Sequence, residues 1–227
     1  HGAAIVMHSL TKYIGGHGTS IGGIVVDGGN FDWTKNRKRQ PLLNEPDQSY
    51  GGAVWIDAVP QLTGANIPFV IRLRVVLLRD TGAPLAPFNA WQIIQGLETV
   101  GLRMKQHCSN AEKVVTFLET QKKVQNVIYP TNHQGEIKER AKKYMQGGYG
   151  SLVGMDVGTK ENGAKFIDNL KMLYHVANIG DARSLAIHPA TTTHSQLDDH
   201  ALAAAGVTPG YVRPVSYTHL RAHETPI

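Results

Sequence analysis

The sequence has a single cysteine, Cys108, among its 227 residues. One thiol cannot form an internal disulfide, which excludes a disulfide-stapled secreted domain and fits a reducing compartment. Long apolar runs are also missing, since no stretch approaches the roughly 20 residues that a membrane-spanning helix needs. The first residues lack the basic-then-apolar pattern of a secretory signal. We therefore expect a cytoplasmic protein with no membrane partner.

Charge is also sparse in this sequence. Charged residues make up 18% and hydrophobic residues 41%, which is typical of a globular rather than a disordered chain. The net charge is +5, and the positive side chains gather only at Lys35–Arg39. This cluster could contact nucleic acid, but it has no interleaved aromatic residues and no recognisable nucleic-acid module. We favour a solvated loop there and expect no nucleic-acid partner.

Short apolar runs predict two strands near the start of the chain. The runs at 3–7 and 21–26 are each followed by turn residues, and the first is typical of a strand buried on both faces. From 30 to 87 the pattern is irregular and rich in glycine, proline and asparagine. Loops of this length tend to be functional or to lie at subunit contacts.

The clearest element is a long helix that Asn89 could cap and that runs to about Lys122. Apolar or small residues recur along it at spacings of three and four, which is one stripe on a helix. The stripe consists of Ile94, Leu97, Gly101, Met104, Cys108, Ala111, Val115 and Leu118. A coiled-coil seam could produce the same pattern, but we favour packing against a sheet. On this stripe Cys108 is a core residue rather than a reactive thiol.

Strands and helices alternate in the rest of the chain. The pattern predicts strands at 124–129, 152–157, 176–179 and 185–188, and helices at 136–146, 160–173 and 198–205. Such alternation indicates an α/β or α+β domain. We place a domain boundary near 130, with one domain in 1–130 and a second in 131–213.

The chemistry-bearing stretch is "HSLTKYIGGHGTSIGG", in which Lys12 lies between hydroxyl residues and glycines. A phosphate-binding P-loop is excluded because the lysine of a P-loop follows its glycines, whereas Lys12 precedes the glycines of this stretch. Ser9 and Lys12 match the Ser-x-x-Lys pattern of serine acyl-enzymes, but the companion motifs Ser-Asp-Asn and Lys-Thr-Gly are absent. A lysine that captures a carbonyl as an imine fits the strand-end position. An ordinary solvated turn stays open on spacing alone.

Four blocks of the sequence carry a further signal: "HSLTKYIGGHGTSIGGIVVDGGNFDW", "APFNAWQIIQGLETVGLRMKQHCSNA", "NIGDARSLAIHPATTTHSQL" and "AAGVTPGYVR". In this order they resemble the Cys/Met-metabolism family of pyridoxal-phosphate enzymes. The resemblance covers nearly all of residues 1–213. It implies an α/β fold of the fold-type-I, aspartate-aminotransferase-like class. Residues 1–130 would then be the C-terminal part of the large cofactor domain, and 131–213 the small domain.

The resemblance also implies roles for single residues. Lys12 matches the lysine that holds pyridoxal 5'-phosphate covalently and later moves protons, and Ser9 and Thr11 match the hydroxyls that bind its phosphate. Arg213 matches the arginine that binds the substrate α-carboxylate, a task suited to a planar guanidinium. Asn178 matches a position that assists it.

No metal site is implied by the remaining polar residues of these blocks. His188 and His194 do not have metal-ligand spacing, and we expect structural or hydrogen-bonding roles for them and for His17. For Arg183, anion binding and an ordinary surface position both stay open.

Within the family, the likeness is strongest to the branch that replaces the acetate of O-acetylhomoserine with sulfide or a thiol. That transferase reaction belongs to transsulfuration and methionine biosynthesis and yields homocysteine or methionine. The resemblance implies a homotetramer that acts on these small molecules. Methionine γ-lyase and cystathionine γ-synthase are the alternatives within the family, and "FDW" with the insertion after it favours the first branch. A piece with only structural content is the alternative from another class.

Two departures from the family pattern qualify this assignment. The chain lacks the family's N-terminal half, which supplies an aromatic that stacks on the cofactor and an aspartate that pairs with its ring nitrogen. We expect the chain to be part of a longer protein and to be inactive by itself. From Pro214 the resemblance ends, and we interpret 214–227 as a non-native tail. Pro214 also removes a donor from an expected strand, which puts the geometry of Arg213 in question.

Overall fold

The computed structural model describes residues 2–215. The chain divides into two compact units, one made of residues 1–10 and 22–90 and the other of residues 11–21 and 91 onward. Each unit is described by itself. The domain boundary near 130 stays a prediction, since the division into units falls near residue 90.

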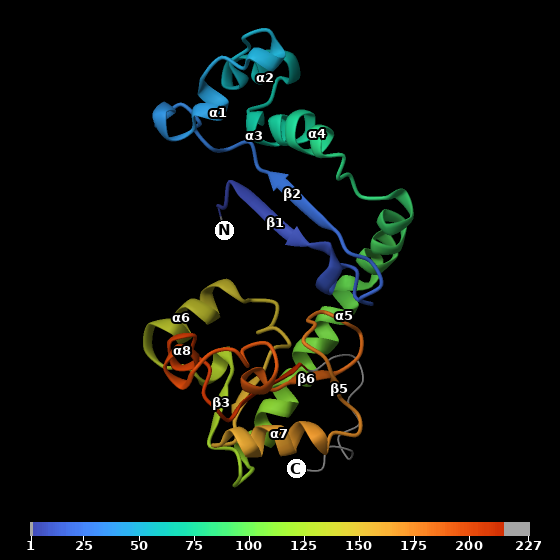
Figure 1. Ribbon diagram of the computed structural model, residues 1–227, viewed down its shortest axis with the longest axis vertical. Coiled ribbons are helices and arrows are strands. Elements are labelled where there is room, and N and C mark those ends of the chain that lie inside the picture. The colour runs from blue at the N-terminus through green and yellow to red at the C-terminus, as the bar shows by residue number, and fades with distance from the viewer. Residues whose placement is uncertain (1, 216–227) are drawn as a thin grey trace. The chain divides into compact units, whose positions relative to one another are not determined.

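The first unit is built on a two-stranded antiparallel sheet. Strand β1 (Ile5–Ser9) pairs with β2 (Gly23–Asp27) in a register that places Ile5 opposite Asp27 and Ser9 opposite Gly23 (Figure 1). The prediction that the first strand is buried on both faces is wrong for this structure, because Met7 is 77% exposed. Two strands alone leave much of both sheet faces open.

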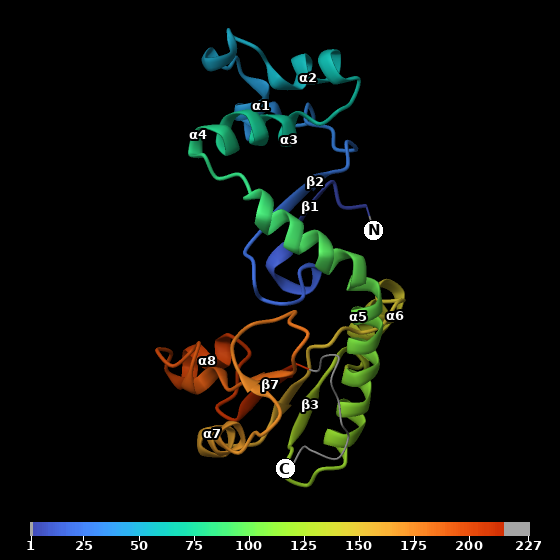
Figure 2. The ribbon, with the colours of Figure 1, turned by 90° about the vertical axis from the view of Figure 1, so that its right-hand side faces the viewer.

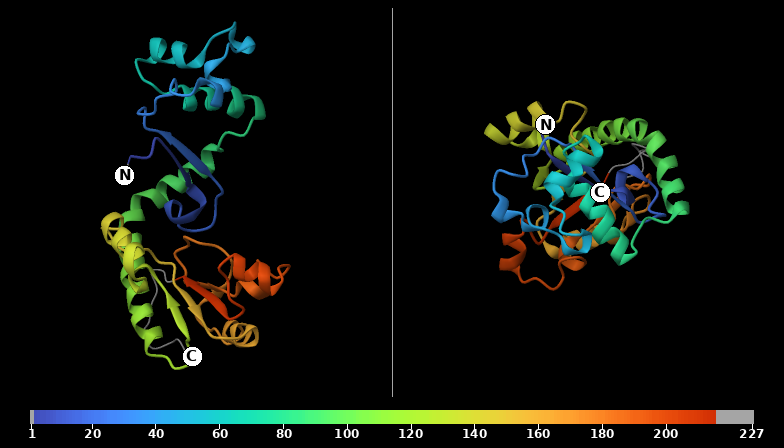
Figure 3. Two further views of the ribbon diagram at one scale, coloured as in Figure 1. Left: turned by 90° about the vertical axis from the view of Figure 1, so that its left-hand side faces the viewer. Right: turned by 90° about the horizontal axis from the view of Figure 1, so that it is seen from above.

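The irregular stretch of the first unit folds into short helices beyond the end of β2 (Figure 3). These helices are α1 (Pro41–Asn44), α2 (Trp55–Thr63), α3 (Pro68–Arg72) and α4 (Arg79–Thr81). Trp33 stacks on Phe69 with ring centroids 5.7 Å apart, and Leu43, Trp55, Ile56 and Val59 complete a small core.

No single described helix is long and apolar enough to cross a bilayer, although α2 and the 68–81 segment, bent by 99°, pass that test as a pair.

The second unit contains a five-stranded sheet, among the described residues, with the order β3-β4-β7-β6-β5. Its strands are β3 (Asn126–Ile128), β4 (Gly154–Asp156), β5 (Tyr174–His175), β6 (Leu185–Ile187) and β7 (Tyr211–Val215). Only β5 and β6 run parallel. Its helices are α5 (Pro87–Glu119), α6 (Gly135–Tyr144), α7 (Lys160–Asp168) and α8 (Asp199–Ala204).

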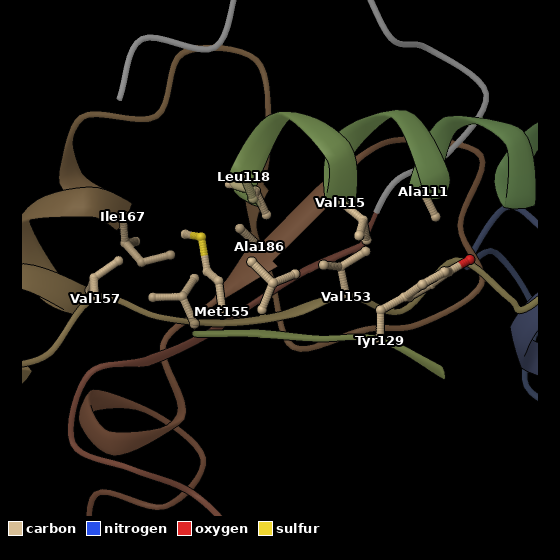
Figure 4. Packing of buried hydrophobic residues seen from close by; sticks show 11 residues of the cluster. Ala111, Val115, Leu118, Tyr129, Val153, Met155, Val157, Ile167 and Ala186 are labelled. Atoms are coloured by element: carbon tan, nitrogen blue, oxygen red, sulfur yellow. The ribbon is translucent and has the colours of Figure 1, made fainter. Parts of the chain in front are cut away.

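The C-terminal half of helix α5 lies along this sheet and supplies one side of the main core (Figure 2). Ala111, Val115 and Leu118 of the helix meet side chains of the sheet such as Val153 and Met155 (Figure 4). Ala111 and Met155 are completely buried, so a dry layer of side chains separates helix and sheet. The predicted alternation of strands and helices is confirmed as an α/β arrangement.

The buried face of α5 differs from its predicted apolar stripe in the N-terminal half. Cys108, Ala111, Val115 and Leu118 are buried as predicted, and Cys108 is a core thiol. Ile94 and Leu97, however, are 55% and 51% exposed, and the buried positions there are instead Ile93, Gly96, Arg103 and His107. This half of the helix contacts the loop that contains Lys12, where glycine and polar side chains fit against backbone.

The helix ends also differ from prediction. Helix α5 begins at Pro87, so the cap predicted at Asn89 is wrong; proline suits the first turn because its missing N–H would have had no partner there. Helix α7 ends at Asp168 rather than 173, and β5 precedes the predicted strand at 176–179. Helix α8 is capped by Asp198, whose side chain accepts from the N–H of Ala201 at 2.8 Å.

Pro214 lies inside β7, the middle strand of the sheet. Its carbonyl accepts from the N–H of Val153 at 3.2 Å, but proline has no N–H to return that bond. The β4–β7 pairing is therefore regular at Met155–Val212 and Asp156–Tyr211 and interrupted beyond them. The strand expected around Arg213 forms in spite of the proline. Of the predicted non-native tail, 214–227, Pro214 and Val215 belong to β7, and the rest lies outside the described residues.

Candidate functional site

The lysine of the glycine-rich loop is held by a distant asparagine. Lys12 lies in the short turn Leu10–Ile14 that follows β1, and its φ and ψ of −87° and −128° depart from helical values. Its amine Nζ donates a hydrogen bond to Oδ1 of Asn178 at 2.6 Å. The structure therefore brings together two of the predicted site residues, both of them half-buried.

The segment after Asn178 packs directly on the backbone of the lysine loop. The N–H of Ala182 donates to the carbonyl of Gly16 at 2.8 Å. Gly180 has a φ of +87°, and a Cβ at this position would lie 2.3 Å from the backbone N of Tyr13. Only glycine satisfies both the backbone angle and the close approach, so the two segments form one packed unit around Lys12.

A buried carboxylate stabilises this segment. Asp181 is 3% exposed and accepts from Arg183 through the backbone N–H at 2.9 Å and through Nε and Nη2 at 3.1 and 2.7 Å. Burial raises the pKa of Asp181, but the hydrogen bonds and charge of Arg183 outweigh it and lower the pKa overall. Arg183 also lies 5.3 Å from the ring centroid of Tyr174. Arg183 is therefore already paired with Asp181, whether it also binds an anion or is an ordinary surface residue.

Arg213 reaches the same segment from β7. Its Nη2 donates to the carbonyl of Ala177, the neighbour of Asn178, at 3.0 Å. Its Nε is buried and has no hydrogen-bond partner among the described residues. A buried guanidinium N–H without an acceptor is costly. The arrangement therefore leaves a donor available for an anionic ligand beside Asn178.

Tyr13 was missed by the analysis of the sequence, although it directly follows Lys12. Its hydroxyl and that of Ser151 lie 2.6 Å apart in a hydrogen bond. Burial raises the pKa of the Tyr13 phenol, and the positive charge of Arg213 opposes part of that rise. The interaction with Arg213 indicates that the guanidinium lies near the lysine loop as well as near residues 177–178.

Arg103 is a second site residue that no sequence pattern indicated. It is 8% exposed, and its Nη1 donates to the carbonyl of Tyr13 at 2.8 Å. Its neighbour one turn along α5, His107, is completely buried and lies with its ring 6.1 Å from that of Tyr13. Burial, with help from the charge of Arg103, lowers the pKa of His107 to about 4. His107 is therefore neutral near pH 7.

The two hydroxyls predicted to bind phosphate lie in different units. Ser9 is the exposed last residue of β1 in the first unit. Thr11 is half-buried in the second unit, close to the glycines Gly15 and Gly18. Their roles in phosphate binding stay predictions.

His188 and His194 make the kind of hydrogen bonds that the sequence predicts for them. His188 is completely buried, with Nδ1 2.9 Å from Oγ1 of Thr191 and Nε2 2.8 Å from the carbonyl of Pro209. The side chain of His194 hydrogen-bonds to the hydroxyl of the adjacent Thr193, and His17 is exposed. In the described part of the chain, no group of three or more His, Cys, Asp or Glu is placed to hold a metal ion.

The arrangement combines an amine, an amide acceptor and a guanidinium around one backbone segment. An amine at this position can capture a carbonyl compound covalently, and the free guanidinium N–H can bind a carboxylate. Together these groups can hold a carbonyl compound covalently beside a carboxylate.

Comparisons with known proteins find similar sequences and structures. Residues 1–216 match the family model described as Cys/Met metabolism PLP-dependent enzyme. The chain is 49% identical over 218 residues to the O-acetyl-L-homoserine sulfhydrylase of Leptospira meyeri, covering 94% of this chain and 49% of that protein. The chain thus spans about half the length of the curated relatives it matches.

Two solved structures share the fold. A putative O-acetylhomoserine (thiol)-lyase from Campylobacter jejuni, which carries a pyridoxyl-lysine monophosphate, matches with a TM-score of 0.85 and 37% identity over 97% of this chain and 51% of that one. A cystathionine gamma synthase from Xanthomonas oryzae matches with a TM-score of 0.70 and 24% identity over 96% of this chain and 47% of that one. The second likeness concerns the fold alone, and both agree with the predicted fold-type-I class.

Proposed function

Since this chain belongs to the Cys/Met-metabolism family of pyridoxal-phosphate-dependent enzymes, we propose that its parent protein replaces the acetate of O-acetylhomoserine with sulfide or a thiol. The observation that carries the proposal is the joining of Lys12 and Arg213 through residues 177–178. When bound, pyridoxal phosphate supplies an aldehyde for the amine and a ring that accepts electrons from the substrate. Every other task falls to side chains of the protein.

Lys12 is the covalent residue of the proposed site. Its amine is half-buried and directed by a single acceptor, Oδ1 of Asn178. A directed amine needs less reorganisation to attack a carbonyl than a freely rotating one. After its release from the cofactor, the same amine can give or take a proton at the reacting carbon.

Arg213 and Asn178 bind the substrate carboxylate. One guanidinium N–H of Arg213 is used on the carbonyl of Ala177, which fixes the direction of the planar group. The buried Nε, without a partner among the described residues, is a donor that remains for an oxygen of the substrate. The amide nitrogen of Asn178 can donate to the second oxygen while Oδ1 faces Lys12.

Ser9 and Thr11 bind the cofactor phosphate. Hydroxyl donors are suited to phosphate oxygens, and the glycines after Lys12 let backbone N–H groups approach closely. This part of the proposal rests on the family match to the segment that contains both residues.

The relatives' names suggest the wider setting of the reaction. The products would be homocysteine, or methionine when methanethiol is the donor, which places the protein in methionine biosynthesis. We infer a homotetramer in the cytoplasm, as the family resemblance implies. Light scattering of the purified protein tests the tetramer.

The experiment that tests the proposed function uses the product of the complete open reading frame that contains this sequence. The purified protein is mixed with pyridoxal phosphate, reduced with borohydride and digested, and the Lys12 peptide is examined by mass spectrometry. We expect the cofactor mass on Lys12 and homocysteine formation from O-acetylhomoserine and sulfide. Lys12→Ala should lose both, whereas Lys165→Ala, at an exposed lysine of α7, should lose neither.

Two results would contradict the proposal. Absence of the cofactor mass from Lys12 would remove the covalent role. Formation of α-ketobutyrate from methionine, without homocysteine synthesis, would assign a γ-lyase reaction instead of the replacement reaction.

A further inference from the structure

Helix α5 presents a buried cation to the loop that carries Lys12. The guanidinium of Arg103 donates four hydrogen bonds, and three of the acceptors are backbone carbonyls. Nη1 donates to Tyr13 at 2.8 Å, Nη2 donates to Ile14 at 3.1 Å and to Gly96 at 2.7 Å, and Nε donates to Oγ1 of Thr99 at 3.1 Å. Arg103 thereby ties the two residues that follow Lys12 to its own helix.

Among residues 2–215, no carboxylate pairs with the Arg103 guanidinium, and the ion pairs in this part of the chain involve other residues. Burying a charge without a counter-ion is unfavourable, and burial lowers the pKa of the Arg103 guanidinium accordingly. An apolar residue would fit the inner face of α5 without that cost. The compensation available to arginine is a set of charge-assisted hydrogen bonds in a fixed, planar geometry.

Two glycines bring the helix and the loop into backbone contact beside Arg103. A Cβ on Gly96 would lie 2.1 Å from the carbonyl oxygen of Gly15, and a Cβ on Gly16 would lie within 2.4 Å of Nη1 of Arg103. No side chain fits between the two segments. The loop after Lys12 is therefore held by α5 on one side and by Gly180 on the other.

We propose that Arg103 is a positioning residue for Lys12: by fixing the carbonyls of Tyr13 and Ile14, it sets the direction from which the Lys12 amine meets an incoming aldehyde. The hydrogen bonds of Arg103 to the lysine loop go to the backbone carbonyls of Tyr13 and Ile14, so it acts through the backbone. The inference rests on the proposed function, because it takes Lys12 as the covalent residue.

The test measures the rate at which Lys12 captures pyridoxal phosphate in the cofactor-free product of the complete reading frame. Arg103→Met removes all four donors at similar length, and Arg103→Lys keeps the charge but cannot span the three carbonyls. We expect Arg103→Met to slow the capture about tenfold or more, the factor that one lost hydrogen bond to a charged group represents. We expect Arg103→Lys to be slowed nearly as much, and the KM for O-acetylhomoserine to stay within about twofold while kcat falls.

A control separates positioning from general loss of stability. Leu202→Ala removes a side chain that is 2% exposed in the cluster formed with Ala190 and Val207. This variant should lower the thermal midpoint and leave the capture rate unchanged at temperatures where the protein is folded. If Leu202→Ala slows capture as much as Arg103→Met at a matched midpoint, the effect is structural and the proposal is overturned.

A second variant covers the case in which Arg103→Met does not fold. Gly96→Ala keeps Arg103 and its charge but pushes a methyl group against the carbonyl of Gly15. It should slow capture in the same way, and an unchanged capture rate in either folded variant overturns the proposal. If the unaltered protein places no cofactor on Lys12, both the proposed function and this inference fail; if it does so and the variants match it, only this inference fails.

Discussion

Lys12 and Asn178 are 166 positions apart in the chain, yet Nζ of Lys12 donates to Oδ1 of Asn178 at 2.6 Å. The bond joins the glycine-rich loop to the segment that Arg213 also contacts. Asn178 therefore has two proposed tasks, since its Oδ1 orients the amine and its Nδ2 can donate to a substrate carboxylate. The two tasks use different atoms, so different substitutions can separate them.

Substitutions of Asn178 should affect cofactor capture and substrate binding differently. Asn178→Ala removes the acceptor, and we expect capture of pyridoxal phosphate at Lys12 to slow about tenfold, as for loss of one hydrogen bond to a charged group. Asn178→Asp keeps an acceptor for the amine but places a negative charge where the substrate carboxylate should bind. Capture should then persist while the KM for O-acetylhomoserine rises about tenfold or more, because like charges repel at short range. Equal effects of both variants on both measurements would contradict the division of tasks.

Arg213→Lys should weaken substrate binding more than it slows the reaction. Lysine keeps the charge but loses the planar pair of N–H groups, including the buried Nε. We expect the KM for O-acetylhomoserine to rise about ten- to a hundredfold, corresponding to one or two lost charge-assisted hydrogen bonds. Steady-state kinetics measure this, with Arg140→Lys as the control because Arg140 is 66% exposed and pairs only with exposed Glu136. A fall in kcat at unchanged KM would place Arg213 elsewhere in the mechanism.

The sequence correctly predicts the buried face of a helix segment where that whole segment packs against apolar side chains. The C-terminal half of α5 contacts a sheet, so its apolar stripe from Cys108 to Leu118 marks the buried face correctly. The N-terminal half contacts backbone, where Gly96 and Arg103 are buried in place of the predicted Leu97. Hydrophobic periodicity cannot identify a helix face that packs against the carbonyl groups of another backbone segment.

The candidate site also contains one residue that a local sequence pattern predicts and others that depend on contacts between distant segments. Lys12, its proposed covalent residue, was indicated by a local pattern, a strand end followed by glycines, together with the family resemblance. The contacts of Arg103 and Tyr13 depend on which distant segments meet, and neither residue belongs to a motif with a known chemical role. A tight glycine such as Gly180 could have indicated the close contact in principle, but its partner backbone is 167 to 168 positions away in the sequence, beyond the range of any local pattern.

The stability of the protein should depend on pH through His107. Its pKa is about 4 in the folded state against an ordinary value of 6.5, so between these values the unfolded chain takes up a proton that the folded chain does not. Stability is therefore highest above pH 6.5 and falls as the pH drops toward 4. The loss is about 3 kcal/mol, at roughly 1.4 kcal/mol for each unit of difference in pKa.

Urea unfolding between pH 7.5 and pH 4 measures this dependence. His107→Gln removes the titrating group, and its free energy of unfolding should fall less over this range than that of the unaltered protein. His200→Gln, at an exposed histidine of α8, is the control and should follow the unaltered protein. If the His107→Gln curve has the same slope with pH as the unaltered one, His107 is not the group responsible.

Substitution of Gly180 should destabilise the protein through two separable effects. A side chain at its φ of +87° costs about 1–2 kcal/mol. A Cβ would also lie 2.3 Å from the backbone N of Tyr13 and 2.5 Å from the carbonyl carbon of Lys12, which adds about 1–3 kcal/mol of overpacking. Gly206 has a φ of +73° with no atom within 4 Å of its Cβ position, so Gly206→Ala isolates the backbone term.

We expect Gly180→Ala to lose more unfolding free energy than Gly206→Ala by about the overpacking cost. Because the collision falls on the peptide of Lys12, Gly180→Ala should also slow the capture of pyridoxal phosphate, which Gly206→Ala should not. Denaturant unfolding and the capture rate together measure both effects. Equal stability of the two variants would mean that residues 178–182 yield easily to the added methyl group, and the packed contact with Lys12 would then have no role in holding the amine in place.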